Sequence, residues 1–173
     1  KVSAVATPRA NIEYEELLSR LRKIDAKATK VTDWQKAYLE HLVKKEKYDV
    51  NSQEVRQYFH YENVRKGIFD LMETMFGITI RPWQAPVWHE SVTAYEILEN
   101  NKVIGRFYLD MHPRDGKYKH AAQFSVTSGL TGLQLPEAAL VCNFPTGLME
   151  HTDVETFLHE FGHLMHDIFA GVN

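Results

Sequence analysis

The stretch from Thr152 to Gly171 reads TDVETFLHEFGHLMHDIFAG and carries the clearest helical pattern in the 173-residue chain. Its apolar residues recur at spacings of three and four, which is the period of a helix with one face in a core. These residues are Phe157, Phe161, Leu164, Met165 and Ile168. Thr152 with Glu155 has the form of a capping box and Gly171 is placed to end the helix, so we expect a rigid helix here.

The opposite face of this predicted helix carries His159, Glu160 and His163, which form the pattern H-E-x-x-H. Because an α-helix turns by about 100° per residue, the two imidazoles lie about 40° apart and one turn from each other, within reach of one metal ion. Glu160 borders the same face, where a carboxylate is able to take a proton from a water that attacks a carbonyl. This spacing predicts a zinc site with His159 and His163 as metal ligands and Glu160 as catalytic base.

Two further polar residues lie close to this motif. His166 lies about 20° from His159 on the helical wheel but two turns away, and three successive turns of a straight helix converge poorly on one ion. We therefore expect His166 to contact a metal ligand or to line a cleft, with an ordinary packing role as the alternative. Asp167 lies near Glu160 on the wheel and has the same expected role, or is a solvated carboxylate. The alternative for the whole motif is a solvated, histidine-rich helix face.

The composition argues against several other classes of protein. The chain has 20 Lys and Arg against 23 Asp and Glu, a net charge of −3, so its charge gives no reason to expect nucleic acid or a membrane surface as partner. The one cysteine, Cys142, forms no internal disulfide and is expected to be a small buried residue. We find no membrane span of roughly 20 apolar residues and no signal-peptide pattern. We therefore expect a soluble, cytoplasmic protein.

Upstream of the motif, the pattern is first helical and then strand-like. Helical spacing predicts a helix from Asn11 to about Thr29, a second one opened by Thr32 and Gln35, a short third one, and a fourth from Val64 to a stop at Gly77. Alternating runs then predict strands at residues 78–80, 91–99, 102–110, 121–127 and 138–144. Asn100-Asn101 joins the second and third strands in a hairpin turn.

The order of these segments predicts the fold class. A helical block, then strands from one contiguous region, then a helix is typical of an α+β fold, which is here mainly helical. Because no helix separates the strands, we expect a small antiparallel or mixed sheet. The chain divides into a helical part, residues 1–77, and a part with the sheet and the motif helix, residues 78–173, within the length of a single domain.

The motif helix, residues 156–166, resembles the zinc helix of the thimet oligopeptidase and oligopeptidase A family of zinc metallopeptidases. Phe-Gly inside the motif and a histidine three residues after it are characteristic of that family. A second resemblance runs from Gly105 to Lys117, in the order glycine, aromatics, Leu-Asp, Pro-Arg and Gly-Lys, and shorter ones lie at residues 87–95 and 140–144. The similarity covers about residues 50–173, and the first fifty residues match only as helical spacer.

The resemblance implies a zinc-dependent oligopeptidase, a hydrolase of short peptides with one Zn²⁺ in the full-length chain, and makes this chain a fragment of a larger zincin-type catalytic domain. It makes His159 and His163 zinc ligands and Glu160 the general base. The family's third ligand, a glutamate on the next helix, and the groups that steady the oxyanion would lie beyond Asn173. We therefore expect the chain alone to bind zinc weakly and to show little peptidase activity. If the apolar face of the zinc helix is left uncovered, we also expect the chain to self-associate.

Two other functions remain open, a non-catalytic zinc-binding or scaffolding module and a metal-free helical interaction domain. Peptidases with this helix commonly hold the substrate by main-chain pairing with an adjacent strand, and Glu137–Phe144 is the candidate, with a plain core strand as the alternative. For Asp110–Lys117, the proline and glycine favour a structural turn over an active-site loop.

Overall fold

The computed structural model describes residues 2–48 and 52–171 and forms two compact units, Lys1–Glu54 and Val55–Asn173. Each unit is described by itself. The division at residue 77 that we expected from the sequence does not coincide with this boundary, because the fourth helix packs with the sheet rather than with the helices before it.

The first unit is a pair of helices, α1 (Val2–Ile24) and α2 (Asp33–Tyr48). An ion pair of 2.9 Å between Arg20 and Glu46 links them. Helix α1 begins nine residues before the expected start at Asn11 and ends before Thr29. Its early start was missed because residues 2–15 are exposed on all sides, so no apolar stripe reveals them.

The start of α2 agrees with the predicted capping box. The backbone N–H of Thr32 donates a hydrogen bond of 3.0 Å to Gln35 Oε1, and the Thr32 hydroxyl donates to the same oxygen at 2.8 Å. The side chain of Gln35 therefore satisfies a donor at the helix entrance that has no partner within the helix.

The second unit contains the helices α4 (Tyr61–Phe76) and α5 (His151–Ala170), and a short helix α3 (Ser52–Arg56) precedes them at the boundary between the units. Helix α4 ends at Gly77 as predicted. Gly77 has φ = 67°, a left-handed conformation that glycine adopts without strain, and its N–H donates to the carbonyl of Glu73.

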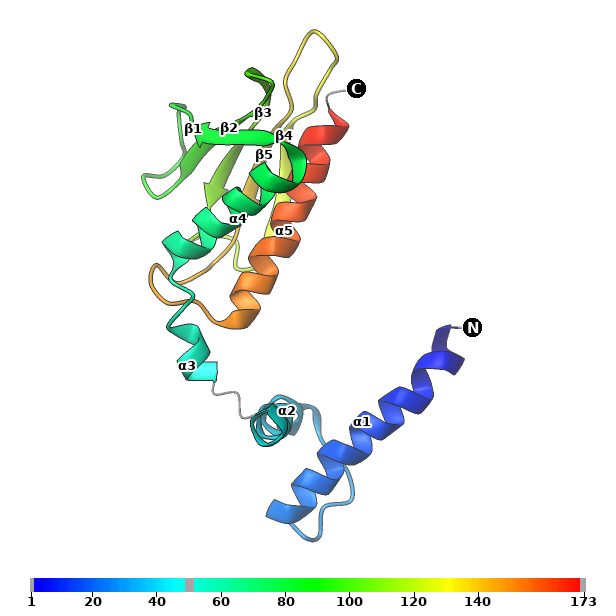
Figure 1. Ribbon diagram of the computed structural model, residues 1–173. Helices are drawn as coiled ribbons and strands as arrows, with labels where there is room; N and C mark the ends of the chain where they lie inside the picture. Colours follow the sequence, from blue (N-terminus) through cyan, green and yellow to red (C-terminus); the bar gives the residue numbers. More distant parts are fainter. Residues whose placement is uncertain (1, 49–51, 172–173) are drawn as a thin grey trace. The chain divides into compact units, whose positions relative to one another are not determined.

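Five strands form one sheet in the order β1-β2-β3-β5-β4. Their bounds are β1 Ile78–Pro82, β2 Thr93–Glu99, β3 Lys102–Asp110, β4 Ala122–Thr127 and β5 Glu137–Val141. After β3 the chain passes to the edge as β4 and returns as β5, which lies parallel to β3 and antiparallel to β4 (Figure 1). The sheet is therefore mixed. The turn between β2 and β3 uses Asn100 and Asn101, both with positive φ, as the hairpin prediction requires.

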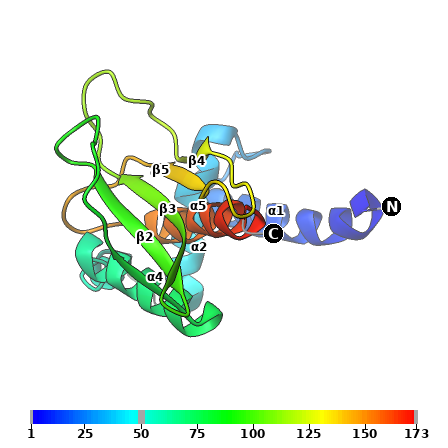
Figure 2. The same ribbon diagram turned by 90° about the horizontal axis from the view of Figure 1, so that it is seen from above.

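Helices α4 and α5 lie side by side on one face of the sheet, and the core lies between them and the strands (Figures 1 and 2). Phe69 of α4 contacts Phe161 of α5 with ring centroids 5.8 Å apart, and Phe76 contacts Phe169 at 5.1 Å, so the two helices run in the same direction. The five apolar residues predicted for the inner face of α5 are all buried. The sequence pattern therefore correctly predicted which face of α5 packs in the core. The opposite face, which carries His159 and His163, is exposed.

Helix α5 also approaches the sheet closely at Gly105 of β3. A Cβ atom built at Gly105 would lie 2.6 Å from Ile168 Cγ2, so only glycine permits this packing distance. The predicted capping box of Thr152 and Glu155 is wrong: Glu150 and Asp153 form it, and the N–H of Glu150 donates to Asp153 Oδ2 at 2.9 Å. The helix begins one residue early as a result. Among the described residues, no helix has the length and apolar character that crossing a membrane requires.

Candidate active site

The two motif histidines converge on the exposed face of α5. His159 and His163 are both exposed, and their rings meet edge to face with centroids 4.8 Å apart. The two Nε2 atoms lie 3.2 Å from each other. Two nitrogen ligands at about 2.0–2.1 Å from a tetrahedral zinc ion stand about 3.3 Å apart. The donor atoms present therefore fit zinc, and the spacing predicted from the helix is realised by the side chains.

The histidine pair brings together two possible nitrogen ligands for one metal ion. Within residues 2–48 and 52–171, no group of three or more His, Cys, Asp and Glu side chains is arranged to hold a metal ion. A protein zinc site normally has three or four protein ligands. The part of the chain that the structure describes thus brings together two possible ligands, fewer than a protein zinc site normally has.

Glu160 is half-buried and close enough to Cys142, the residue that follows strand β5, for its charge to act on that thiol. Its position is reflected in the pKa of Cys142, which burial, and to a lesser extent the nearby charge of Glu160, raise to about 12. Cys142 is fully buried, as predicted, and its thiol stays protonated at neutral pH. The nucleophile of any reaction here is therefore not this cysteine.

His166 and Asp167 lie further along the same helix. His166 is exposed on the face of the histidine pair. Asp167 is half-buried, and its Oδ2 atom accepts hydrogen bonds from Gln123 Nε2 at 2.7 Å and from the Ser125 hydroxyl at 2.5 Å. Both donors belong to β4, so Asp167 links the motif helix to the edge strand. Nothing in the sequence indicated this link, because the donors are more than 40 residues away.

The expected substrate strand, Glu137–Phe144, has no free edge over its regular part. Strand β5 pairs with β3 on one side and with β4 on the other. The prediction is therefore wrong for β5, because the chain places β4 outside it. Strand β4 is the edge strand on this side of the sheet and contacts α5. Its Phe124 and Val126 side chains are 47% and 53% exposed, which leaves its surface open to a second chain.

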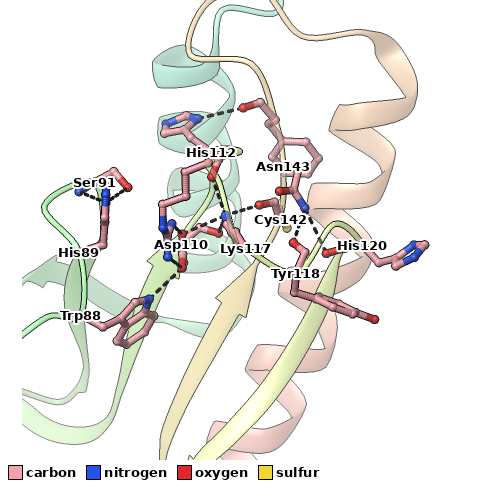
Figure 3. A network of polar contacts seen from close by, with 12 residues as sticks. Trp88, His89, Ser91, Asp110, His112, Lys117, Tyr118, His120, Cys142 and Asn143 are labelled. Atoms are coloured by element: carbon pink, nitrogen blue, oxygen red, sulfur yellow. Dashed lines mark hydrogen bonds and ion pairs between the residues drawn. The ribbon is translucent and has the colours of Figure 1, made fainter.

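A buried polar network holds the loop after β3 (Figure 3). The carboxylate of Asp110 is 2% exposed and accepts two hydrogen bonds from Arg114, at 2.6 and 2.8 Å, and one from Trp88 Nε1, at 2.8 Å. Lys117 Nζ lies 2.9 Å from Asp110 Oδ1 and also donates to the carbonyls of Asp110, His112 and Cys142. One ammonium group thus joins the end of β3, the loop and the residue that follows β5.

This network lowers the pKa of Asp110. Burial alone would raise it, but the hydrogen bonds from Arg114, Lys117 and Trp88 stabilise the charged carboxylate more strongly and bring the pKa well below its ordinary range. A carboxylate with such a pKa holds its charge at any physiological pH and does not serve as a proton carrier. These contacts support a structural role for Asp110–Lys117.

The segment after β5 is fastened to the same loop by further hydrogen bonds. The N–H groups of Cys142 and Phe144 donate to the carbonyls of Asp110 and Met111, each at 2.8 Å. His112 Nδ1 donates to the carbonyl of Phe144 at 3.0 Å, and the amide of Asn143 donates to the carbonyl of Tyr118 at 3.0 Å. These hydrogen bonds therefore fix the loop to residues 142–144, which follow β5.

Comparison with known proteins finds similar sequences that cover the whole chain or most of it. The profile of Peptidase family M3 matches residues 1–173. A thimet-like oligopeptidase of Dictyostelium discoideum is 33% identical over the whole of this chain, and oligopeptidase A of Escherichia coli is 31% identical over 95% of it. Saccharolysin of Saccharomyces cerevisiae is 32% identical over 78% of it. The chain spans 29%, 26% and 22% of the length of these three relatives, respectively.

Proposed function

The chain belongs to peptidase family M3, and from this membership we propose that it is part of the catalytic region of a zinc-dependent oligopeptidase that hydrolyses short peptides. The observation that carries the proposal is the approach of His159 Nε2 and His163 Nε2 to 3.2 Å on the exposed face of α5. A pair of imidazoles at this spacing is suited to a metal ion.

His159 and His163 would hold the zinc ion, and Glu160 would act as the general base. When bound, zinc supplies Lewis-acid chemistry that polarises a carbonyl and acidifies water. Glu160 follows His159 directly and borders the histidine face, so its carboxylate is placed to accept a proton from the attacking water. Because Glu160 is half-buried and the histidines are exposed, the base is held by the fold while the peptide approaches from solvent.

We propose that an extended peptide substrate pairs with the free edge of β4. Two features support β4 over β5: it is the edge strand, and its Phe124 and Val126 side chains are exposed. Like β5, it also contacts α5, which carries the histidine pair. An edge strand offers unpaired N–H and C=O groups, which bind a peptide main chain without regard to its sequence. Such binding suits an enzyme that accepts varied short peptides.

The properties of the 173-residue chain by itself should differ from those of the full-length enzyme. Because the described residues bring two zinc ligands together and no third, we propose that it binds zinc weakly and hydrolyses peptides slowly or not at all. In isolation it would then behave as a zinc-binding module. We propose the cytoplasm as its location, which is consistent with a sequence whose one cysteine excludes an internal disulfide.

The test uses the full-length product of the gene and a quenched fluorescent peptide. Wild type should cleave the peptide, and Glu160→Gln should retain bound zinc, measured by atomic absorption, while its kcat falls at least about 1,000-fold. The matched control is Glu155→Gln, which changes an exposed carboxylate on the same helix and should leave kcat unchanged. Hydrolysis that survives Glu160→Gln would contradict the assignment of the base.

A further inference from the structure

We propose that Asp167 is a positioning residue for the substrate: it holds the edge strand β4 against the metal-binding helix and thereby aligns a bound peptide with the histidine pair. This inference rests on the proposed function of α5 and β4. It assigns to Asp167 a partner and a task that the helical wheel alone did not indicate.

The first support is the weak attachment of β4 to the sheet. Strand β4 has one strand neighbour, β5, and their pairing register shifts between Ser125 and Thr127. Such an irregularity removes ladder hydrogen bonds and bends the strand. A contact from another element therefore adds to the weak attachment of β4 to the sheet.

Asp167 supplies such a contact at two points. Its Oδ2 atom accepts from Gln123 Nε2 at 2.7 Å and from Ser125 Oγ at 2.5 Å. Residues 123 and 125 alternate with Phe124, so they lie on the face of β4 toward the helix while Phe124 faces away. Hydrogen bonds to a charged carboxylate are about twice as strong as neutral ones. One side chain thus fixes both the distance and the register of β4 relative to α5.

The position of Asp167 along α5 relates its hydrogen bonds to β4 to the position of the histidine pair. Asp167 follows His163 by four residues, which is one helical turn or about 6 Å along the axis. The metal ligands and the tether to β4 therefore belong to one rigid element. The hydrogen bonds of Asp167 to β4 therefore determine the distance between a peptide paired with β4 and the two histidines. A shift of about 1 Å at a reacting group is enough to slow a reaction strongly.

The experiment compares Asp167→Ala, Asp167→Asn and the control Glu155→Ala in the full-length gene product. Glu155 is an exposed carboxylate of the same helix whose ion pair is with His151, so its removal leaves β4 untouched. Three quantities are measured: hydrogen exchange of the β4 amides, zinc affinity, and the dissociation constant of a short peptide. The peptide is bound to a Glu160→Gln background, so that it is not cleaved.

We expect Asp167→Ala to speed exchange in β4 and to weaken peptide binding, each by about tenfold, with zinc affinity unchanged. Asp167→Asn keeps an acceptor oxygen and should restore most of the peptide affinity, whereas Glu155→Ala should behave as wild type. A role in stability alone would lower the melting temperature of Asp167→Ala and leave the peptide dissociation constant unchanged well below that temperature.

Unchanged β4 exchange or unchanged peptide affinity in Asp167→Ala would overturn the inference. A wild-type protein that binds zinc but no peptide would also overturn it, while the metal site would stand. A failure of the proposed function looks different: wild type would bind no zinc, or its hydrolysis would be independent of Glu160.

Discussion

Lys117 Nζ lies 2.9 Å from Asp110 Oδ1, and each of the two side chains is only 3% exposed. Removing one member of a buried ion pair leaves the other charge without its partner in a medium that solvates it poorly. In this network the ammonium also donates to the carbonyl groups of Asp110, His112 and Cys142, so its loss would remove a hydrogen bond from each of them.

We therefore predict that Lys117→Met lowers the free energy of unfolding by about 3–5 kcal/mol. The measurement is equilibrium unfolding in urea. The matched control is Lys66→Met, which removes a 2.6 Å ion pair with Asp70 on the exposed surface of α4 and should cost less than about 1 kcal/mol. Equal losses in the two variants would mean that burial does not strengthen the Lys117 network.

The lowered pKa of Asp110 predicts a pH dependence of stability in acid. The unfolded chain binds a proton at Asp110 near pH 4 and the folded chain only at lower pH, so stability falls as pH decreases below about 4. Asp110→Asn should be less stable at pH 7 and should lose less stability between pH 5 and pH 2.5. Unfolding free energies at a series of pH values test this, and parallel curves for the two proteins would contradict it.

Zinc binding should depend on the two converging histidines and not on the third one. We predict that His163→Ala abolishes calorimetrically detectable zinc binding to the 173-residue chain, because a single imidazole remains. His166→Ala removes an exposed histidine of the same helix face and should change the zinc affinity by less than about threefold. A comparable loss in both variants would make His166 a ligand.

Two glycines of the second unit should respond in opposite ways to alanine. A Cβ atom at Gly105 would lie 2.6 Å from Ile168 Cγ2 and 2.9 Å from Ile168 Cδ1, so Gly105→Ala should destabilise the unit by about 1–3 kcal/mol. Ile168→Val removes Cδ1 and should relieve the part of this loss that comes from the Cδ1 contact. A Cβ atom at Gly162, in the middle of α5, meets nothing within 4 Å. Gly162→Ala should therefore stabilise the chain by about 0.5–1 kcal/mol. Thermal unfolding measures both, and a destabilised Gly162→Ala would contradict the second expectation.

Cys142 should be unreactive in the folded protein. Its thiol is fully buried and its pKa is raised to about 12, so thiolate is scarce at pH 8. We predict that a disulfide reagent such as dithiobis(nitrobenzoate) modifies Cys142 at pH 8 at least about 100-fold more slowly in the native chain than in 6 M guanidinium chloride. Absorbance of the released thiolate follows the reaction, and rapid modification without denaturant would show that this segment opens.

The sequence predicted those parts of the fold that local periodicity determines. Helices α4 and α5 bury one face each, so their apolar residues recur at the helical period, and Asn100-Asn101 marks a turn that needs two residues with positive φ. The first half of α1 lacks a buried face and therefore lacks this signal. The first residue of α5 was predicted wrongly because a contact with a distant segment fixes the chain before the helix. The N–H of Met149 donates to the carbonyl of Phe59 at 2.8 Å.

The same distinction holds for the candidate site. The convergence of His159 and His163 follows from two residues four apart on one helix, and the side chains adopt it. The place of β4 at the sheet edge and its contact with Asp167 depend on pairing between distant strands, which a single sequence does not encode in any local pattern. The convergence of the two histidines was therefore predictable, whereas the place of β4 at the sheet edge was not.

The position of α5 after all five strands has a consequence for biosynthesis. The face of the sheet that α5 covers includes Phe107, Leu109 and Leu140, which are fully buried in the folded unit. A ribosome releases α4 and the strands before α5, so the part of this apolar face that α5 covers stays exposed until residues 151–170 have left the exit tunnel. Until then the apolar side chains of the nascent sheet are exposed to solvent or bound by a chaperone. The helix that would bind the metal is thus also the element that completes the core.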